Sequence, residues 1–313
     1  MQPTVATIGF FDGVHMGHEH LIRQVSEIAV IRHMEAAVVT FPVHPRQVLQ
    51  PDFRPQLLTT SEEKLTLLQH YIPRNAEEKA ELLRDNRPFL DRCIMMEFTP
   101  EVARLTAREF MLRLRDEYDV RILVTGYDHR FGHNRSEGFK EYAAYGEELG
   151  MEVIRAQAYL HNKQLISSSY IRQLITEGDM EKAGVFLGAD YFLQGTVVGG
   201  HHVGRSLGYP TANLRINSPL KLVPADGVYA VQVQIDHEPG HHIGMMNIGH
   251  RPTLDNGSDR SIEVHILDFT GNLYGHHLLL RFASRIRPEQ KFDTLDTLTR
   301  QLAKDAATVR EML

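Results

Sequence analysis

Only one cysteine, Cys93, occurs in the 313 residues of this sequence. A single thiol excludes a disulfide framework and any zinc or iron–sulfur site that is built on several cysteines. The sequence also lacks an apolar run long enough to cross a bilayer, and its first residues lack the basic and apolar segments of a secretory signal. We therefore expect a cytoplasmic protein with no membrane partner.

A surplus of positive charge is missing as well, since the formal net charge is -6 at pH 7. Proteins that bind nucleic acid normally present a basic face, so we exclude nucleic acid as a partner and expect any phosphate to be bound by local groups. The 18 histidines include three adjacent pairs, which we interpret as solvated loop residues because neighbouring side chains rarely chelate a metal together. The oligomeric state is not decided by the composition, and we expect a monomer or a weak oligomer.

The chain is long enough for two domains. In its first part, short apolar runs alternate with helical patterns, which predicts βαβ units around a parallel sheet. The expected strands are residues 4–9, 36–41, 92–96, 121–125 and 151–156. The expected helices are residues 18–34, a helix after Thr60, residues 107–116 and residues 136–150, with capping-box spacing for Thr60 and Glu63 and for Thr106 and Glu109.

Beyond about residue 187 the pattern changes to strands separated by turns, which predicts a mostly antiparallel β structure. Val231, Val233 and Ile235 alternate with glutamines, as is typical of a strand with one wet face. Apolar residues at helical spacing predict a last helix over residues 294–312, which we expect to pack on the sheet rather than bind a partner. These patterns give two domains, residues 1–187 and residues 188–313.

The sharpest local signal is GFFDGVHMGH, residues 9–18, which follows the first strand and opens the first helix. Doubly wound sheets bind nucleotides at this position, where glycines allow close backbone approach and the helix N-terminus attracts anions. His15 and His18 are three residues apart, so both imidazoles can face one anion. The loop has neither P-loop nor dinucleotide spacing and no serine or cysteine nucleophile, which favours direct attack by a substrate phosphate on the α-phosphorus of ATP.

Two further segments can converge on that site. GYDHRFG, residues 126–132, follows a later strand, and ISSSYIR, residues 166–172, begins a helix. Serines at a helix start are usually caps, and an arginine there is usually solvated. Beside the first loop, however, Arg130 and Arg172 become candidates for the β- and γ-phosphates, and Asp128 for the substrate or a metal.

The second domain contains a glycine-rich loop that leads into PTAN, residues 210–213, and a lone carboxylate on a strand. Glycine-rich turns between strands are common, so this loop alone is a weak signal. Glu263 stands between Ile262 and Val264 and points away from them, so it is either solvated or lines a cavity.

Together these motifs, with FPVHPR at residues 41–46, resemble the prokaryotic bifunctional riboflavin kinase/FAD synthetase family in order along nearly the whole chain. The departures are Phe10 in place of the usual Asn, Pro42 and Val43 before His44, His129 in place of Phe and Ser169 in place of Thr. The Phe10 change puts one substrate hydrogen bond in doubt. The charged region of residues 74–92 is not typical of the family.

The resemblance implies a Rossmann-like HxGH nucleotidyltransferase domain, residues 1–187, followed by a six-stranded antiparallel β-barrel with a C-terminal helix, residues 188–313. The first would be an FMN adenylyltransferase and the second a riboflavin kinase. Small molecules would be the partners: riboflavin, FMN and ATP as substrates, with Mg²⁺ required by both reactions.

It also implies roles for individual residues. His15 and His18 would be catalytic in the first domain, with Glu263 as the catalytic base of the second. In the first domain, ATP and its phosphates would contact Gly9, Phe11, Asp12, Gly13, Gly17, Arg130, Ser168, Ser169 and Arg172, and FMN would contact His44 and Asp128. In the second, ATP and flavin would contact Gly204, Arg205, Gly208, Pro210, Thr211, Asn213, Arg251 and Arg285, with Thr211 and Asn213 holding Mg²⁺ through ATP.

Two rival hypotheses remain open from the sequence. One is a nucleotidyltransferase of the same class with another substrate, such as a cytidylyltransferase, in which the second half only regulates. PTAN and Glu263 disfavour it. The other is a flavin-binding or RNA-binding module that has lost catalysis, which the intact histidines and the acidic balance disfavour.

Overall fold

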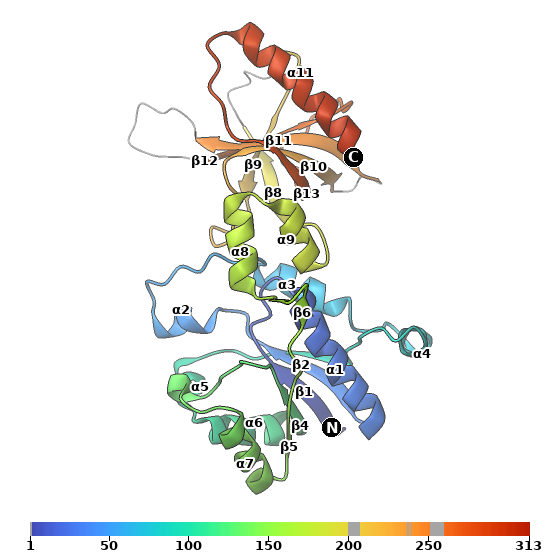
Figure 1. The fold of residues 1–313 in the computed structure, drawn as a ribbon, viewed down its shortest axis with the longest axis vertical. Helices are drawn as coiled ribbons and strands as arrows, with labels where there is room; N and C mark the ends of the chain where they lie inside the picture. Colours follow the sequence, from blue (N-terminus) through green and yellow to red (C-terminus); the bar gives the residue numbers. More distant parts are fainter. Residues whose placement is uncertain (1, 200–206, 237, 239, 251–259) are drawn as a thin grey trace. The chain divides into compact units, whose positions relative to one another are not determined.

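A computed structural model describes residues 2–199, 207–236, 238, 240–250 and 260–313 (Figure 1). The chain divides into two compact units, Met1–Ser168 and Ser169–Leu313. The first unit is built around a five-stranded parallel sheet with the strand order β3-β2-β1-β4-β5. Its strands are β1 (Thr4–Ile8), β2 (Glu35–Thr40), β3 (Arg92–Met95), β4 (Val120–Thr125) and β5 (Glu152–Arg155). The parallel pairing confirms the βαβ units expected from the apolar runs.

Helices cover both faces of this sheet. They are α1 (Met16–Arg32), α2 (Pro45–Leu49), α3 (Ser61–Gln69), α4 (Ala76–Arg84), α5 (Pro100–Arg104), α6 (Ala107–Tyr118) and α7 (Phe139–Leu149), with a 3₁₀ turn η1 (His133–Arg135) and a hairpin of β6 (Leu160–His161) and β7 (Gln164–Leu165). Successive strand residues point to opposite faces, so Val5 and Ala36 pack with α1 and α4 while Ala6 and Ala37 pack with α6 and α7. Both faces are therefore buried, as is usual for parallel sheets.

Local hydrogen bonds determine where the helices begin. The capping boxes expected at Thr60 and Thr106 are both present at the starts of α3 and α6. α7 begins at Phe139, later than expected, where the carboxylate of Glu141 accepts a hydrogen bond from the amide of Gly138. α1 begins earlier than expected because His15 is its N-cap residue, with extended backbone angles.

The central strand β1 lies between β2 and β4. The chain crosses from β1 through α1 to β2 on one side, and from β4 through α7 to β5 on the other. The loops after β1 and β4 therefore leave the same edge of the sheet in opposite directions. Such a topological switch point is the usual place for a ligand in an open α/β sheet.

The second unit contains α8 (Ser168–Glu177), α9 (Met180–Leu187) and, in the part of the chain that is described, six strands that close into an antiparallel barrel (Figure 1). The barrel order is β10-β11-β12-β9-β8-β13. Its strands are β8 (Phe192–Val198), β9 (Ala212–Ile216), β10 (Gly227–Ile235), β11 (His242–His250), β12 (Arg260–Ile266) and β13 (His277–Arg287). Val231, Val233 and Ile235 are buried and Gln234 is exposed, so the expected alternation is confirmed.

The last helix, α11 (Leu295–Met312), packs on the barrel as expected. Val309 and Ala306 are buried against Val228 and Met245. Leu295, in contrast, is exposed, because it is the first residue of the helix and lies beyond the contact with the strands. The buried pair of Arg287 and Asp305, with Nη2 2.8 Å from Oδ2, joins β13 to this helix.

The contact-based division falls at Ser168, whereas the sequence places the domain boundary between residues 187 and 188. Two contacts explain why α8 groups with the barrel. The amide of Ala225 donates a hydrogen bond to the carbonyl of Ile175, and Arg285 donates to the carbonyl of Glu177. The boundary of the two functions stays a prediction.

The Arg287–Asp305 pair gives the first testable prediction. Asp305→Ala leaves a largely buried guanidinium without its bidentate partner, so it should lower the free energy of unfolding of the barrel unit by about 3–5 kcal/mol. Asp296→Ala on the same helix removes a solvent-exposed pair with Arg300 and should change little. Urea unfolding of both variants provides the measurement, and equal stabilities would contradict the role given to Asp305.

Candidate active sites of the two units

The loop between β1 and α1 has an unusual backbone. Phe11, Gly13 and Val14 have φ angles of 54°, 82° and 38°, values that side-chain-bearing residues rarely adopt. The ring of Phe11 is buried in the core with Val14 and Ile22, which fixes the loop from beneath. Strained backbone of this kind persists where surrounding contacts over-determine it, and it is frequent at functional sites.

The two histidines of the loop lie face to face. Their ring centroids are 3.6 Å apart, and the ring planes differ by 15°. His15 is 4% exposed and His18 is half-buried. A Cβ at Gly17 would lie 3.2 Å from the His15 ring, so a glycine there leaves room for the stacked arrangement. The two rings thus lie together at the first turn of α1, and their common contact with one anion stays a prediction.

The His18 imidazole is held in its neutral form. Burial, the adjacent His15 and the charge of Lys64 lower the pKa of His18 well below its ordinary value of 6.5. Among the described residues, the buried Nδ1 of His18 has no hydrogen-bond partner. A neutral imidazole at a helix N-terminus can donate one hydrogen bond to a phosphate oxygen through its single N–H group, without carrying a net charge.

The buried carboxylate of Asp12 ties the loop to a distant part of the chain. Its carboxylate accepts hydrogen bonds from the amides of Leu58, at 3.1 Å, and Thr59, at 3.0 Å. The hydroxyl of Thr59 in turn accepts a hydrogen bond from the amide of Gly13 at 3.0 Å. Asp12 was expected to contact ATP, and this expectation remains untested. Its observed partners include the amides of Leu58 and Thr59 and the hydroxyl of Thr59.

Two other predicted segments reach the loop. The hydroxyl of Ser168 donates a hydrogen bond to the carbonyl of Asp12 at 3.1 Å. The ring of His44, the N-cap residue of α2, lies 4.7 Å from the ring of Phe10 and 5.5 Å from that of Phe53. Where the family has Asn, Phe10 thus adds an aromatic contact to the segment that carries His44.

Lys64 is a residue that the sequence reasoning missed. It is 1% exposed, and its ammonium group donates hydrogen bonds to the carbonyls of Phe10, at 3.0 Å, and Phe41, at 2.6 Å. One signal was present in the sequence. Lys64 and Leu68 share a helix face, and a lysine four residues before a buried leucine stands on the apolar side of α3.

Asp128 and Arg130 follow β4 and line a cavity of about 470 Å³ together with Tyr127, Lys140 and Arg155. This cavity lies at the carboxyl end of the strand that pairs with β1. None of residues 9–18 lines it. The structure therefore places Asp128 and Arg130 at the expected edge of the sheet, in a cavity that residues 9–18 do not line.

The remaining predicted residues of the first site, Ser169 and Arg172, belong to the second compact unit. Ser169 is exposed and Arg172 half-buried on α8. Their assignment to ATP stays a prediction.

In the barrel, the three polar residues singled out by sequence come together. The hydroxyl of Thr211 donates a hydrogen bond to Oε2 of Glu263 at 3.1 Å. Glu263 on β12 is the direct neighbour of Asn213 on β9 and of Asn247 on β11. Ile262 and Val264 are buried, so the carboxylate faces the other way, as expected from the strand alternation.

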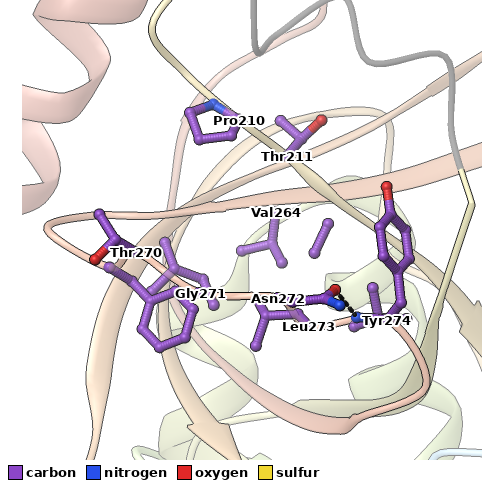
Figure 2. A pocket seen from close by; sticks show the side chains of 12 residues that line it. Pro210, Thr211, Val264, Thr270, Gly271, Asn272, Leu273 and Tyr274 are labelled. Carbon is purple, nitrogen blue, oxygen red and sulfur yellow. Dashed lines mark hydrogen bonds between the residues drawn. The ribbon is translucent and has the colours of Figure 1, made fainter.

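Beside Thr211 the barrel is hollowed by a pocket of about 680 Å³ (Figure 2). Pro210 and Thr211 line one side, and the segment Phe269–Tyr274 lines the other. The carboxamide of Asn272 accepts a hydrogen bond from the amide of Tyr274 at 3.1 Å, which shapes this turn. Sequence reasoning missed residues 269–274, whose only signal was a Gly-Asn turn flanked by two aromatic residues.

The other predicted residues of the barrel site are spread out. Gly208 lies in an exposed turn with φ 82°, and Pro210 accepts a hydrogen bond from Nδ1 of His265 at 2.8 Å. Arg285 donates to the carbonyls of Glu177 and Asp226, and it does not line the pocket. Gly204, Arg205 and Arg251 lie outside the described residues, so the predictions made for them are untested.

His129, which stands where the family has Phe, gives the second prediction. Burial and the charge of Arg135 lower the pKa of His129 to about 4. The unfolded chain takes up this proton near pH 6.5, so the stability that His129 contributes is complete above that pH and is lost as the pH falls from about 6.5 to about 4. His129→Phe should remove this loss, worth at most about 3 kcal/mol.

Thermal unfolding followed between about pH 4 and about pH 7 measures this effect. His70→Phe, the same substitution at an exposed position, should keep the pH dependence of the original protein, because it leaves the ring of His129 in place. An unchanged slope in His129→Phe would contradict the assignment.

Comparison with known proteins shows where these two sites belong. The family model described as FAD synthetase matches residues 1–72 and 74–170, and the model described as riboflavin kinase matches residues 187–313. Proteins named bifunctional riboflavin kinase/FMN adenylyltransferase are 35% identical in Listeria monocytogenes, over 98% of this chain and 91% of that protein, and 34% identical in Escherichia coli K12, over 98% and 92%. The Bacillus subtilis protein of the same name is 33% identical over 96% and 90%.

A solved structure from Streptococcus pneumoniae, described as a macrolide-efflux protein, matches with a TM-score of 0.79 and 32% identity, over 98% of this chain and 94% of that one. The efflux description does not transfer with the fold. In the described part of this chain, no helix is both long and apolar enough to span a membrane. The agreement of both family models with both sites, over nearly the whole length, shows that the chain belongs to the bifunctional riboflavin kinase/FMN adenylyltransferase family.

Proposed function

We propose that this protein makes flavin cofactors in two ATP-dependent steps, phosphorylation of riboflavin to FMN and adenylylation of FMN to FAD. Each of the two family models matches a stretch of chain that contains its own cluster of polar residues, and this observation supports two separate reactions. In the first unit the cluster is the stacked pair His15 and His18 at the N-terminus of α1. In the barrel it is the Thr211–Glu263 pair beside the pocket.

In the adenylylation step, a phosphate oxygen of FMN attacks the α-phosphorus of ATP. A new P–O bond forms, the bond to the bridging oxygen of the β-phosphate breaks, and pyrophosphate leaves. The protein's part is to position both phosphates and to stabilise the charge that develops on their oxygens. The N-terminus of α1, with the positive end of its helix dipole, and the neutral imidazole of His18 lie at this place.

In the kinase step, the 5′-hydroxyl of riboflavin attacks the γ-phosphorus of ATP, and ADP leaves. Glu263 takes the proton of that hydroxyl as the new P–O bond forms. The hydrogen bond from Thr211 to one carboxylate oxygen restricts the orientation of the Glu263 side chain. Its strand neighbours in the register are Asn213 and Asn247.

The barrel residues also suit a hard divalent cation. Thr211, Asn213 and Glu263 offer hydroxyl, amide and carboxylate oxygens, the ligand types that Mg²⁺ prefers. We propose that Thr211 and Asn213 hold Mg²⁺ together with the phosphates of ATP, where the ion would neutralise phosphate charge. In the described residues, no group of three or more His, Cys, Asp or Glu side chains is arranged as a metal site.

We also propose bounds for the two functions, contacts for the remaining site residues and an oligomeric state. The first function would occupy residues 1–187 and the second residues 188–313, acting on free riboflavin, FMN and ATP in the cytoplasm. Arg130 and Arg172 would contact the β- and γ-phosphates, and His44 and Asp128 the flavin substrate of the first unit. The protein would act as a monomer or a weak oligomer.

His18→Ala tests the first site. It removes an imidazole donor at the reacting phosphates, so adenylylation of supplied FMN should fall by about 100-fold or more, while FMN formation from riboflavin should stay unchanged. Chromatography of flavins after incubation with Mg-ATP separates the two products. His70→Ala, at an exposed helix end, serves as the control and should keep both activities. Equal loss of both activities in His18→Ala would count against two separate sites.

Glu263→Gln tests the second site. Glutamine keeps an acceptor for Thr211 but cannot take up a proton, so riboflavin phosphorylation should fall by about 100-fold or more with adenylylation of supplied FMN intact. Glu311→Gln, an exposed position on α11, is the matched control. If Glu263→Gln keeps its kinase turnover, Glu263 is not the base.

A further inference from the structure

A buried side chain hydrogen-bonds to both loops of the proposed adenylylation site. Lys64 of α3 is 1% exposed, and its Nζ lies 3.0 Å from the carbonyl oxygen of Phe10 and 2.6 Å from that of Phe41. Phe10 belongs to the loop that carries His15 and His18. Phe41 begins the segment that carries His44.

Burying an ammonium group is costly unless its donors are satisfied and its charge is compensated. Lysine has three N–H donors, and two of them are used by these carbonyls. The ring of Phe10 lies 3.9 Å from Nζ, close enough for a cation–π contact. The ion is therefore held by one loop through a carbonyl and a ring, and by the other through a carbonyl.

We propose that Lys64 is a positioning residue for adenylyl transfer, whose ammonium group fixes the loop of His15 and His18 relative to the segment of His44. This inference rests on the proposed function of those histidines. Lys64 does not touch the reacting atoms. It acts through the two backbone carbonyls, so its removal should change the position of the two loops relative to each other without removing any catalytic group.

Neighbouring contacts also hold the histidine loop. Thr40, the residue before Phe41, donates to the carbonyl of Phe10 at 3.2 Å, the ring of Phe10 contacts that of His44, and Asp12 anchors the loop to Leu58 and Thr59. The first two of these contacts also join the histidine loop to the segment of Phe41 and His44, and Lys64 adds a buried charge to them. Among the hydrogen bonds of the described side chains, that of Lys64 is the one that reaches both Phe10 and Phe41.

The charge of Lys64 also acts on the site. Three titratable groups face it: Asp12 from the loop, His18 from α1 and Cys93 from β3. Burial lowers the pKa of Lys64 to about 8, although Asp12 and Cys93 favour its charged form. The ammonium charge in turn helps to lower the pKa of His18 and so keeps that imidazole neutral.

Activity and stability should respond to alkaline pH in opposite directions. Above about pH 8 the ammonium loses its charge, so the tie weakens and adenylylation should fall. The unfolded chain keeps the proton up to its ordinary pKa of 10.5, so between these values the unfolded state binds more protons and the contribution of Lys64 to stability rises with pH. A purely structural lysine would not lower the activity while stability rises.

The experiment compares Lys64→Met, Lys64→Arg and the control Lys163→Met, the last at an exposed turn of the same unit. Methionine keeps a flexible chain of similar size without the charge. We expect Lys64→Met to lower kcat/KM for adenylylation of FMN by about 10- to 100-fold, mainly in kcat, with riboflavin phosphorylation unchanged. Lys163→Met should match the original protein.

Arginine keeps its charge throughout the assay range, so Lys64→Arg should shift the alkaline fall of adenylylation to higher pH. Thermal unfolding is measured in parallel at each pH. If Lys64→Met does not fold, the comparison of the pH profiles of Lys64→Arg and the original protein decides. An alkaline limb at the same pH in both, or a folded Lys64→Met with undiminished adenylylation, would overturn the proposal. If His18→Ala still abolishes FAD formation in that case, only the role of Lys64 falls.

Discussion

The buried carboxylate of Asp12 is the constraint on which the first site depends. The loop after β1 takes backbone angles that residues such as Phe11 and Val14 adopt at a cost, and it can hold them only if its polar groups are satisfied elsewhere. Asp12 provides this by accepting hydrogen bonds from the amides of Leu58 and Thr59, and the hydroxyl of Thr59 accepts a hydrogen bond from the amide of Gly13. The histidines are therefore presented by a scaffold assembled from two distant stretches of chain.

In the barrel, the register of the paired strands positions the polar residues of the site. Thr211 lies 52 residues before Glu263 in the sequence, and its hydroxyl reaches the carboxylate because the pairing of β9 with β12 places Asn213 opposite Glu263. Register in a closed barrel is strongly specified, because a slip of one residue would turn every buried side chain outward. The position of the carboxylate is thus set by the packing of Ile262 and Val264 on the opposite side.

Much of this arrangement could be predicted from the sequence, because it depends on local patterns. Alternating apolar runs indicated the parallel sheet, and the capping residues Thr60 and Thr106 marked helix starts that the structure confirms. The parts that were missed depend on tertiary contacts. For the burial of Lys64 the only local signal is the helix face that it shares with Leu68, and nothing local shows that Arg285 is engaged by Glu177 and Asp226 or that α8 groups with the barrel. Such contacts join segments whose separation in sequence carries no periodic signal.

The missing side chain of Gly17 leaves space that the ring of His15 uses. A Cβ at this position would lie 3.2 Å from the His15 ring, which stacks on the ring of His18. Because Gly17 has no Cβ, the ring of His15 can lie close against the helix backbone while it stacks on His18. Any other residue here would place its Cβ 3.2 Å from that ring, which would then have to move by a few tenths of an ångström.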